Sequence, residues 1–154
     1  MMTIHGGFYK HFGSRDELIA EAVERALTDS ETLIAEVVAT SEDPLSTFID
    51  AYVSPEHRDD PGNGCGVAAL CNDVAHLGGI AQGTYSDQVE RYLGHLAALT
   101  GDGRARAAAI LSTMVGAVVI ARALGPTSAS DELLRDVRAS LHHDTDQERS
   151  RASP

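Results

Sequence analysis

Residues 104–124 read RARAAAILSTMVGAVVIARAL, and this stretch decides the fold. Its apolar side chains would fall on nearly every face of a helix, so this chain or a second copy must cover all of its sides. The most apolar part, residues 105–121, is interrupted by Arg106, Ser112 and Thr113 and falls short of the roughly 20 residues that a membrane span needs. We therefore expect a buried central helix.

Apolar residues also recur at helical spacing before this stretch. Ser14 and Glu17 have the spacing of a capping box, which predicts a helix from Arg15 to about Ala39. Asp43 and Pro44 supply an N-cap and a first-turn proline for a short helix that ends at Ser54-Pro55. Two further helices are predicted, one stopped by Gly78-Gly79 and one closed near Gly101.

The remaining segments complete an all-helical prediction. Residues 55–64 are charged and rich in Pro and Gly, which favours a surface loop. Gly125-Pro126 ends the central helix, and Ser128 or Ser130 caps a last amphipathic helix. Residues 143–154 are polar without apolar periodicity, so we expect a disordered tail. Because no segment alternates apolar and polar residues, we predict an all-α helical bundle without strands.

Composition limits the classes of function. A chain of 154 residues with 43% hydrophobic residues is long enough for one domain with a real core. The formal net charge of −11 argues against a surface devoted to nucleic acid, because phosphate binding relies on clustered Lys and Arg. Residues 1–15, however, contain Lys10 and Arg15 and neither Asp nor Glu. Any contact with DNA must therefore come from the N-terminal end.

Residues 3–18 read TIHGGFYKHFGSRDEL, and this segment resembles the recognition helix and the following helix start of TetR-family transcriptional regulators. The Phe-Tyr-Lys-His-Phe core, followed by Ser-Arg and Leu, is among the most specific parts of that family's pattern. Residues 54–62, 64–65, 68–70 and 108–124 are similar to the ligand-binding domain of one branch of that family. The family's DNA-reading head has three helices. The first two precede the recognition helix, so the resemblance implies an incomplete head here.

The resemblance implies which residues would meet DNA. A recognition helix needs some side chains that reach base edges and others that grip phosphates. Thr3, His5 and Gly6 match the start of the helix that faces the groove, and the remaining residues would contact phosphates. The alternative is a frayed terminal segment with a chance aromatic cluster. The expected DNA-binding residues are Thr3, His5, Gly6, Tyr9, Lys10, His11 and Arg15.

The middle of the chain is the expected ligand site. Bulky apolar side chains with a few hydroxyls suit a small apolar or aromatic ligand, because the hydroxyls orient what the apolar walls enclose. The alternative is that the same residues are ordinary helix-bundle core. The expected ligand-binding residues are Phe48, Tyr52, Leu70, Val74, Tyr85, Val89 and Tyr92.

The resemblance also implies a homodimer. It assigns the central helix and the last helix to a two-fold four-helix interface, although the same pattern suits a contact within one chain. Ser112, Gly116 and Ala117 are small enough to let another helix approach closely. The expected interface residues are Leu111, Met114, Val115, Gly116, Val118, Leu134, Val137 and Leu141.

Cys65 and Cys71 do not indicate a metal site or a catalytic site. Their spacing of six is not a zinc signature, and no matching pair of ligands follows. Structural packing is the favoured role and reactive sensing the alternative. An enzyme that uses Cys71 or a carboxylate is a third hypothesis, but the sequence shows no organised catalytic group. We expect neither cofactor nor metal. The first residues do not form a signal peptide, so we expect a cytoplasmic protein.

These observations predict three parts. Residues 1–40 would be the remnant of a helix-turn-helix head and its connecting helix, residues 41–142 a ligand-binding and dimerisation domain, and residues 143–154 the disordered tail. The resemblance implies a repressor in which a ligand shifts residues 15–27, changes the separation of two recognition helices and weakens operator binding. The alternative is a headless helical dimer that binds a ligand or a partner without reading DNA.

Overall fold

The computed structural model describes residues 14–152, without the side chains of residues 15–16, 29–34, 36–38, 148–149 and 151–152. Within this part of the chain every regular element is a helix, which confirms the all-α prediction. The helices are α2 (Arg15–Ala39), α3 (Pro44–Tyr52), α4 (Pro55–Asp59), α5 (Gly66–Leu77), α6 (Gly79–Thr100), α7 (Arg104–Leu124) and α8 (Ser128–Ala152).

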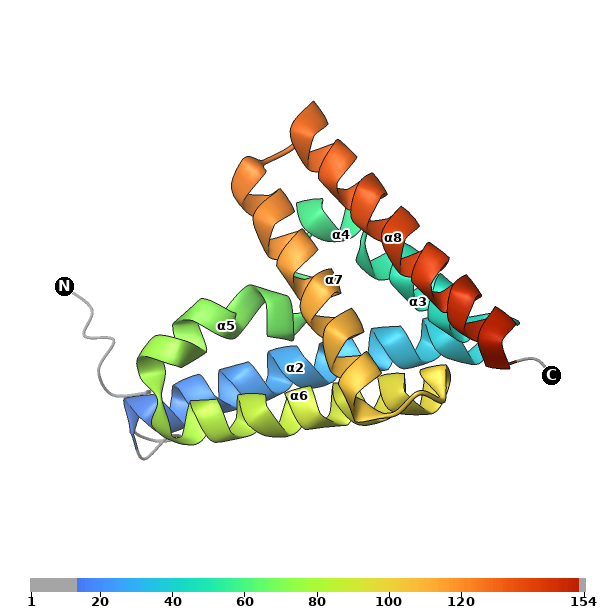
Figure 1. Cartoon of the computed structure of the whole chain (residues 1–154). Helices are drawn as coiled ribbons and strands as arrows, with labels where there is room; N and C mark the ends of the chain where they lie inside the picture. The colour runs from blue at the N-terminus through green and yellow to red at the C-terminus, as the bar shows by residue number, and fades with distance from the viewer. Residues whose placement is uncertain (1–13, 153–154) are drawn as a thin grey trace.

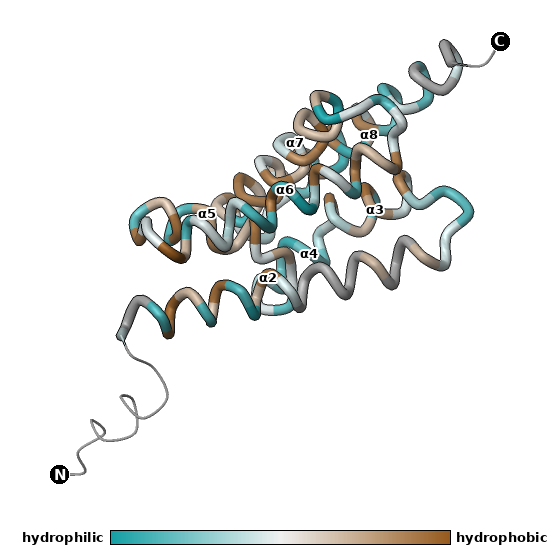
Figure 2. The backbone as a smooth tube through the Cα atoms, turned by 90° about the horizontal axis from the view of Figure 1, so that it is seen from below, coloured by the Kyte–Doolittle hydropathy of each residue, from teal (hydrophilic) through white to brown (hydrophobic). Residues whose placement is uncertain are grey.

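The helices form two crossing groups (Figure 1). Helices α2 and α6 lie side by side, and α7 and α8 form an antiparallel pair that crosses them. Helix α7 contacts α3, α4, α5, α6 and α8, which makes it the centre of the fold. In Figure 2 hydrophilic and hydrophobic residues alternate in the coloured first half of α2, as expected for a helix with one face on the core.

Helix α7 is buried on one side within this chain, whereas the sequence prediction required that this chain or a second copy cover all of its sides. Its buried face belongs to the hydrophobic cluster that also contains Leu27 of α2, Ile49 of α3 and Leu134 of α8. Among the described residues α7 alone has the length and apolar composition of a membrane span, contrary to the expectation that it falls short. The buried residues of α7 are Ala107, Ile110, Leu111, Met114, Ala117, Val118 and Ala121.

The helix starts follow from the capping residues in the sequence. The Ser14 hydroxyl accepts a hydrogen bond from the Glu17 backbone N–H at 3.1 Å, which forms one half of the expected capping box. The Asp43 carboxylate accepts from the Ser46 N–H at 3.3 Å and so begins α3, with Pro44 in the first turn as predicted. Gly101 ends α6 with φ of 72°, a left-handed conformation that favours glycine.

Two predicted boundaries are wrong. Residues 55–64 are not simply a surface loop, because Ser54 caps the short helix α4 by accepting from the His57 N–H at 3.1 Å. Residues 143–152 are not disordered, because α8 continues to Ala152. Apolar periodicity ends near Leu141, yet local bonds such as that between Gln147 Nε2 and His143 Nε2, at 2.8 Å, support the added turns.

Candidate functional site

The seven expected ligand-binding residues lie together in the structure. Phe48, Tyr52, Val74 and Tyr92 are buried, and Leu70, Tyr85 and Val89 are half-buried against the same hydrophobic cluster. They come from α3, α5 and α6, so three helices contribute to one region. Both sequence interpretations agree with this placement, because the seven residues are core residues whether or not a ligand inserts between them.

Aromatic rings at the end of α3 pack edge to face. The ring centroids of Phe48 and Tyr52 are 5.6 Å apart at 67°, and those of Tyr52 and His57 are 4.6 Å apart at 71°. This geometry places the positive edge of one ring over the negative face of the next. It also brings a histidine into the region, which the sequence analysis did not include.

His57 joins α3 to the start of α5. Its Nδ1–H donates to the Tyr52 carbonyl at 2.7 Å, and its Nε2 accepts from the Cys65 backbone N–H at 2.9 Å. Both ring nitrogens are therefore used by a neutral imidazole with the proton on Nδ1. Burial lowers the pKa of His57 and the nearby Arg122 charge lowers it too, against the opposing effects of the Tyr52 carbonyl and Asp60.

The pKa of His57 predicts acid sensitivity. In the unfolded chain His57 takes a proton near its ordinary pKa of 6.5, whereas the folded protein resists protonation because its pKa is lower. The free energy of unfolding therefore falls as the pH drops below 6.5, until the folded pKa is reached. We expect the melting temperature of the wild type to fall more steeply between pH 7 and 5 than that of His57→Gln. His76→Gln, at an exposed histidine, should keep the wild-type slope; equal slopes in all three proteins would contradict the assignment.

Gly64 allows this histidine contact. A Cβ atom at Gly64 would lie 2.7 Å from both Cδ2 and Nε2 of His57 and 3.0 Å from the Arg122 guanidinium. We expect Gly64→Ala to destabilise the protein by about 1–3 kcal/mol, the usual cost of overpacking. Urea unfolding should show a smaller cost for the same substitution in a His57→Ala background. Equal costs in both backgrounds would show that the ring is not the obstacle.

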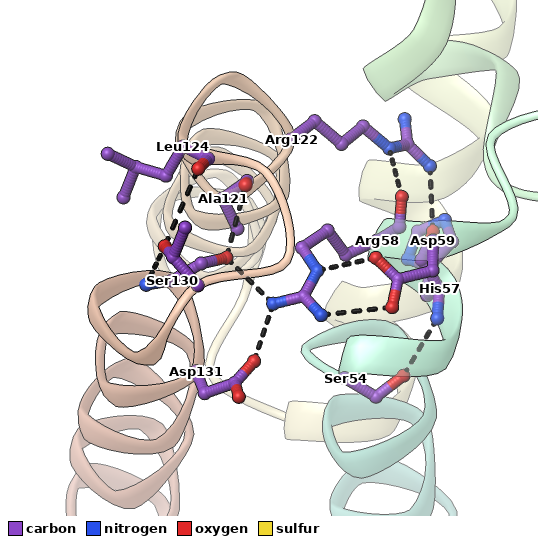
Figure 3. Close-up of polar contacts among 10 residues, drawn as sticks. Ser54, His57, Arg58, Asp59, Ala121, Arg122, Leu124, Ser130 and Asp131 are labelled. Carbon is purple, nitrogen blue, oxygen red and sulfur yellow. Dashed lines mark hydrogen bonds and ion pairs between the residues drawn. The ribbon is translucent and has the colours of Figure 1, made fainter.

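A buried arginine holds α4 against the turn between α7 and α8 (Figure 3). Arg58 is only 5% exposed, and its guanidinium donates to Asp59 at 2.7 and 2.9 Å. It also donates to the Ser130 hydroxyl at 2.8 Å and to the Asp131 carboxylate at 2.5 Å. The hydrogen bond from Arg58 holds the pKa of Asp59 below its usual value.

A second arginine approaches α4 from α7. Arg122 donates to the His57 carbonyl at 2.9 Å and to the Arg58 carbonyl at 3.3 Å, so it caps the end of the short helix (Figure 3). The Ser130 hydroxyl in turn donates to the Ala121 carbonyl at 3.1 Å. We call Arg58, Asp59, Arg122, Ser130 and Asp131 the α4 clasp. It links the region of Tyr52 and His57 to the α7–α8 pair.

The expected dimer interface needs correction. Five of its residues, Leu111, Met114, Val118, Leu134 and Leu141, are buried inside the protomer, because α7 and α8 turn them toward the core of their own chain. They therefore cannot form an exposed contact surface. Val115, Gly116 and Val137 are half-buried.

The exposed side of α7 carries other apolar residues. Ile120 is 52% exposed and Leu124 is 44% exposed. No described atom lies within 4 Å of a Cβ built on Gly116, so this position also opens outward. We call Gly116, Ile120 and Leu124 the α7 outer face. Helical periodicity alone did not distinguish it from the buried face, because α7 is apolar on both.

A cavity of about 150 Å³ lies at the turn between α5 and α6, beside the start of α2. None of the seven expected ligand-binding residues lines it. Two of the residues that line it, Leu77 and Ile80, are exposed. In the sequence Gly78-Gly79 indicates only a helix stop, so this cavity was not predicted. The lining residues are Ile19, Leu77, Gly78, Gly79, Ile80 and Ala81.

The expected DNA-binding residues are not tested by the structure. Thr3, His5, Gly6, Tyr9, Lys10 and His11 lie outside the described residues. Arg15 is the first residue of α2, and only its backbone is described.

Both cysteines are free thiols. Cys65 is buried and its Sγ lies 3.8 Å from the Tyr92 hydroxyl oxygen, while Cys71 is half-buried with its Sγ 3.8 Å from the Ala68 carbonyl. Among the described residues no group of three or more His, Cys, Asp and Glu side chains is placed to hold a metal ion. These contacts are what structural packing requires of the two thiols.

No protein-family model matches the chain, and no curated protein is significantly similar to it in sequence.

Proposed function

We propose that this chain is a ligand-responsive transcriptional regulator of the TetR type, acting as a repressor whose operator binding a small apolar or aromatic ligand relieves. The observation that carries the proposal is the segment TIHGGFYKHFGSRDEL at residues 3–18, which combines the motif of a recognition helix with the cap of α2. A charge pattern supports it, because Lys10 and Arg15 stand in the one N-terminal stretch without Asp or Glu.

Helix α2 provides a physical route from ligand to DNA. It begins directly after the motif and contacts α3, α5 and α6, the helices that bear the expected ligand-binding residues. A ligand that spreads these helices would displace α2 and with it the preceding DNA-reading segment. Such coupling requires that the ligand bind one position of α2 more tightly than the other.

The proposal includes a homodimer formed through α7 and α8. Regulators that read two half-sites need two recognition helices at a fixed separation, which a two-fold dimer supplies. The α7 outer face supports this role, because Ile120 and Leu124 expose apolar area that a second copy would cover. The exposed apolar residues replace the five buried ones of the sequence prediction as the contact surface.

A headless dimer that binds a ligand or partner without reading DNA is the second candidate. The formal net charge of −11 favours it, since an acidic body repels phosphates. Binding to the DNA that flanks the chain's own gene separates the two candidates, when residues 1–13 are presented in a complete three-helix head. Selective binding supports the regulator, and its absence in that form supports the headless dimer.

A further inference from the structure

Apolar residues line the cavity at the α5–α6 turn, which has a volume of about 150 Å³. Ile19 contributes from α2, so the cavity lies between the first turns of α2 and the connection of two other helices (Figure 1). Leu77, the last residue of α5, is 44% exposed, and Ile80, in the first turn of α6, is 63% exposed. A group that entered the cavity would cover apolar area on both side chains.

The volume of the cavity restricts what can fill it. Sites for drug-sized ligands measure roughly 300–1,000 Å³, which is at least about twice this volume. A cavity of about 150 Å³ with apolar walls accommodates one benzene-sized ring. None of the lining residues has an ionisable side chain, so the occupant that fits is an uncharged apolar group. A single phenyl ring meets both conditions.

The chain carries a phenyl ring close to this cavity. Residues 1–13 lie outside the described residues and join α2 at Ser14, whose hydroxyl caps that helix. Ile19 is five residues further along, a rise of about 7.5 Å in a helix. Phe12 is two residues before Ser14, so the two Cα atoms are at most about 7 Å apart. Gly13 between them allows backbone conformations that turn the chain back toward Ile19.

The short tether favours this ring over a free molecule. A group on a short flexible tether has an effective concentration in roughly the millimolar range at a site within its reach. Phe8, the other phenylalanine before α2, is four residues further along the chain, so closing its loop costs more entropy. Charge does not oppose the contact, because residues 1–13 contain Lys10 and neither Asp nor Glu, while the whole chain has a net charge of −11.

We propose that the cavity at the α5–α6 turn is a docking site for the N-terminal segment of the same chain, and that the phenyl ring of Phe12 fills it between Ile19, Leu77 and Ile80. The docked ring removes apolar area of Leu77 and Ile80 from water. It also ties the segment before α2 to the connection between α5 and α6. The inference goes beyond the proposed function, because the contact forms whether or not residues 3–15 read DNA.

NMR of the full chain with labelled methyl groups gives the first test. The ring protons of Phe12 should show nuclear Overhauser contacts with the δ1 methyl groups of Ile19 and Ile80, since such contacts arise only between protons that are close in space. Phe12→Ala should move both methyl resonances, because the ring current of the docked ring is lost. Phe8→Ala is the matched control, and it should leave both resonances in place. Missing contacts, or equal methyl shifts in the two variants, would overturn the proposal.

Thermal unfolding gives the second test. Phe12→Ala should lower the melting temperature by at least about 3 °C, because the apolar area that the ring shared with the cavity returns to water. Phe8→Ala should lower it by less than half of that amount. A Phe8→Ala loss as large as the Phe12→Ala loss would mean that the cavity does not select Phe12, and the assignment would be rejected.

Benzene gives the third test, as a free ring that can replace the tethered one. In Phe12→Ala it should move the Ile80 methyl resonance in a saturable way, because the cavity is then vacant. In the wild type that resonance should not respond, because the Phe12 ring holds the cavity. An equal response in the wild type would make the cavity a site for free ligands instead. No response in either protein would show that the cavity does not take a phenyl ring, and either result would overturn the docking.

Operator binding, measured with residues 1–13 in a complete three-helix head, keeps this inference apart from the regulator proposal. One docked ring anchors the segment at a single point, so it does not replace the helices that present a recognition helix. Contacts between Phe12 and Ile80 without selective DNA binding would retain the docking site and reject the regulator. Selective DNA binding without those contacts would reject the docking site and retain the regulator.

Discussion

Ile120→Glu is expected to convert the protein from a dimer into a monomer at micromolar concentration. Ile120 is 52% exposed on the α7 outer face, so a second copy that packs there would bury the new carboxylate. A two-fold interface contains the same change twice. Burying two unpaired carboxylates costs several kcal/mol, and a loss of only about 3 kcal/mol weakens the dimer more than roughly 100-fold. Analytical ultracentrifugation would measure the change.

The matched control is Ile80→Glu. Ile80 is also an exposed isoleucine on a helix, at 63%, but it lies at the α5–α6 turn and away from the α7–α8 pair. This variant should remain dimeric. Gly116→Arg, which projects a long side chain from the same face as Ile120, should also dissociate the dimer. A dimeric Ile120→Glu would place the interface elsewhere, whereas a monomeric wild type would remove the dimer from the proposed function altogether.

The circular dichroism spectrum of Ile120→Glu should match that of the wild type, because the substituted side chain is outside the protomer's core. This check separates dissociation from unfolding. Met114→Ala, at a fully buried position on α7, shows the contrast. It should lower the free energy of unfolding by about 2–5 kcal/mol through the cavity it leaves.

The helices were predictable because their signals are local. Two adjacent residues, Asp43 and Pro44, predict the start of α3. The hydrogen bond from the Ser46 N–H to the Asp43 carboxylate confirms the N-cap. Gly125 ends α7 in the same local way, with φ of 69°. Where cap and periodicity coincide, neighbouring elements are not needed to locate a helix boundary.

The α4 clasp was not predictable, because its partners are distant in sequence. Arg58 and Asp131 are 73 residues apart, and Arg122 and His57 are 65 apart. Pro, Gly and charged residues between 55 and 64 favour a surface loop, because a charged side chain is buried only where a hydrogen-bond or ion-pair partner meets it. The approach of α8 supplies Ser130 and Asp131 as partners, so Arg58 is buried although the other residues of α4 stay exposed or half-buried.

The contact face of α7 could not be predicted from the sequence, for a different reason. In an amphipathic helix the polar residues mark the side that faces solvent, and so they identify the opposite side as buried. Helix α7 has apolar residues on every face, so this signal is missing. The sequence prediction therefore chose Met114 and Val118, which pack in the protomer, and omitted Ile120 and Leu124, which do not.

Lys10→Ala is expected to weaken operator binding at least about tenfold in a chain whose residues 1–13 are presented by a complete three-helix head. Lys10 would contact a phosphate in each half-site, so a dimer loses two phosphate contacts. The affinity should fall for specific and non-specific DNA alike, and the slope of log affinity against log salt should decrease by about two. Fluorescence anisotropy with the DNA that flanks the gene measures both quantities.

Arg135→Ala is the matched control, because it removes the same charge from an exposed side chain on α8 that the proposal does not place on DNA. It should leave the affinity and the salt slope close to those of the unsubstituted protein. Tyr9→Ala should weaken binding as Lys10→Ala does. A Lys10→Ala loss no larger than that of Arg135→Ala would mean that residues 3–15 do not read DNA.

The chain of 154 residues alone should bind the same DNA poorly. Residues 1–12 are at the lower limit of the roughly 12–15 residues at which an isolated helix becomes marginal in water, and Gly6 and Gly7 lower its helicity further. A recognition helix reads the major groove only when other helices hold it rigidly. Lys10 and Arg15 add little non-specific attraction against a net charge of −11. Tight, sequence-selective binding by this chain alone would show that the two additional helices are not required, and would remove the physical basis of this prediction.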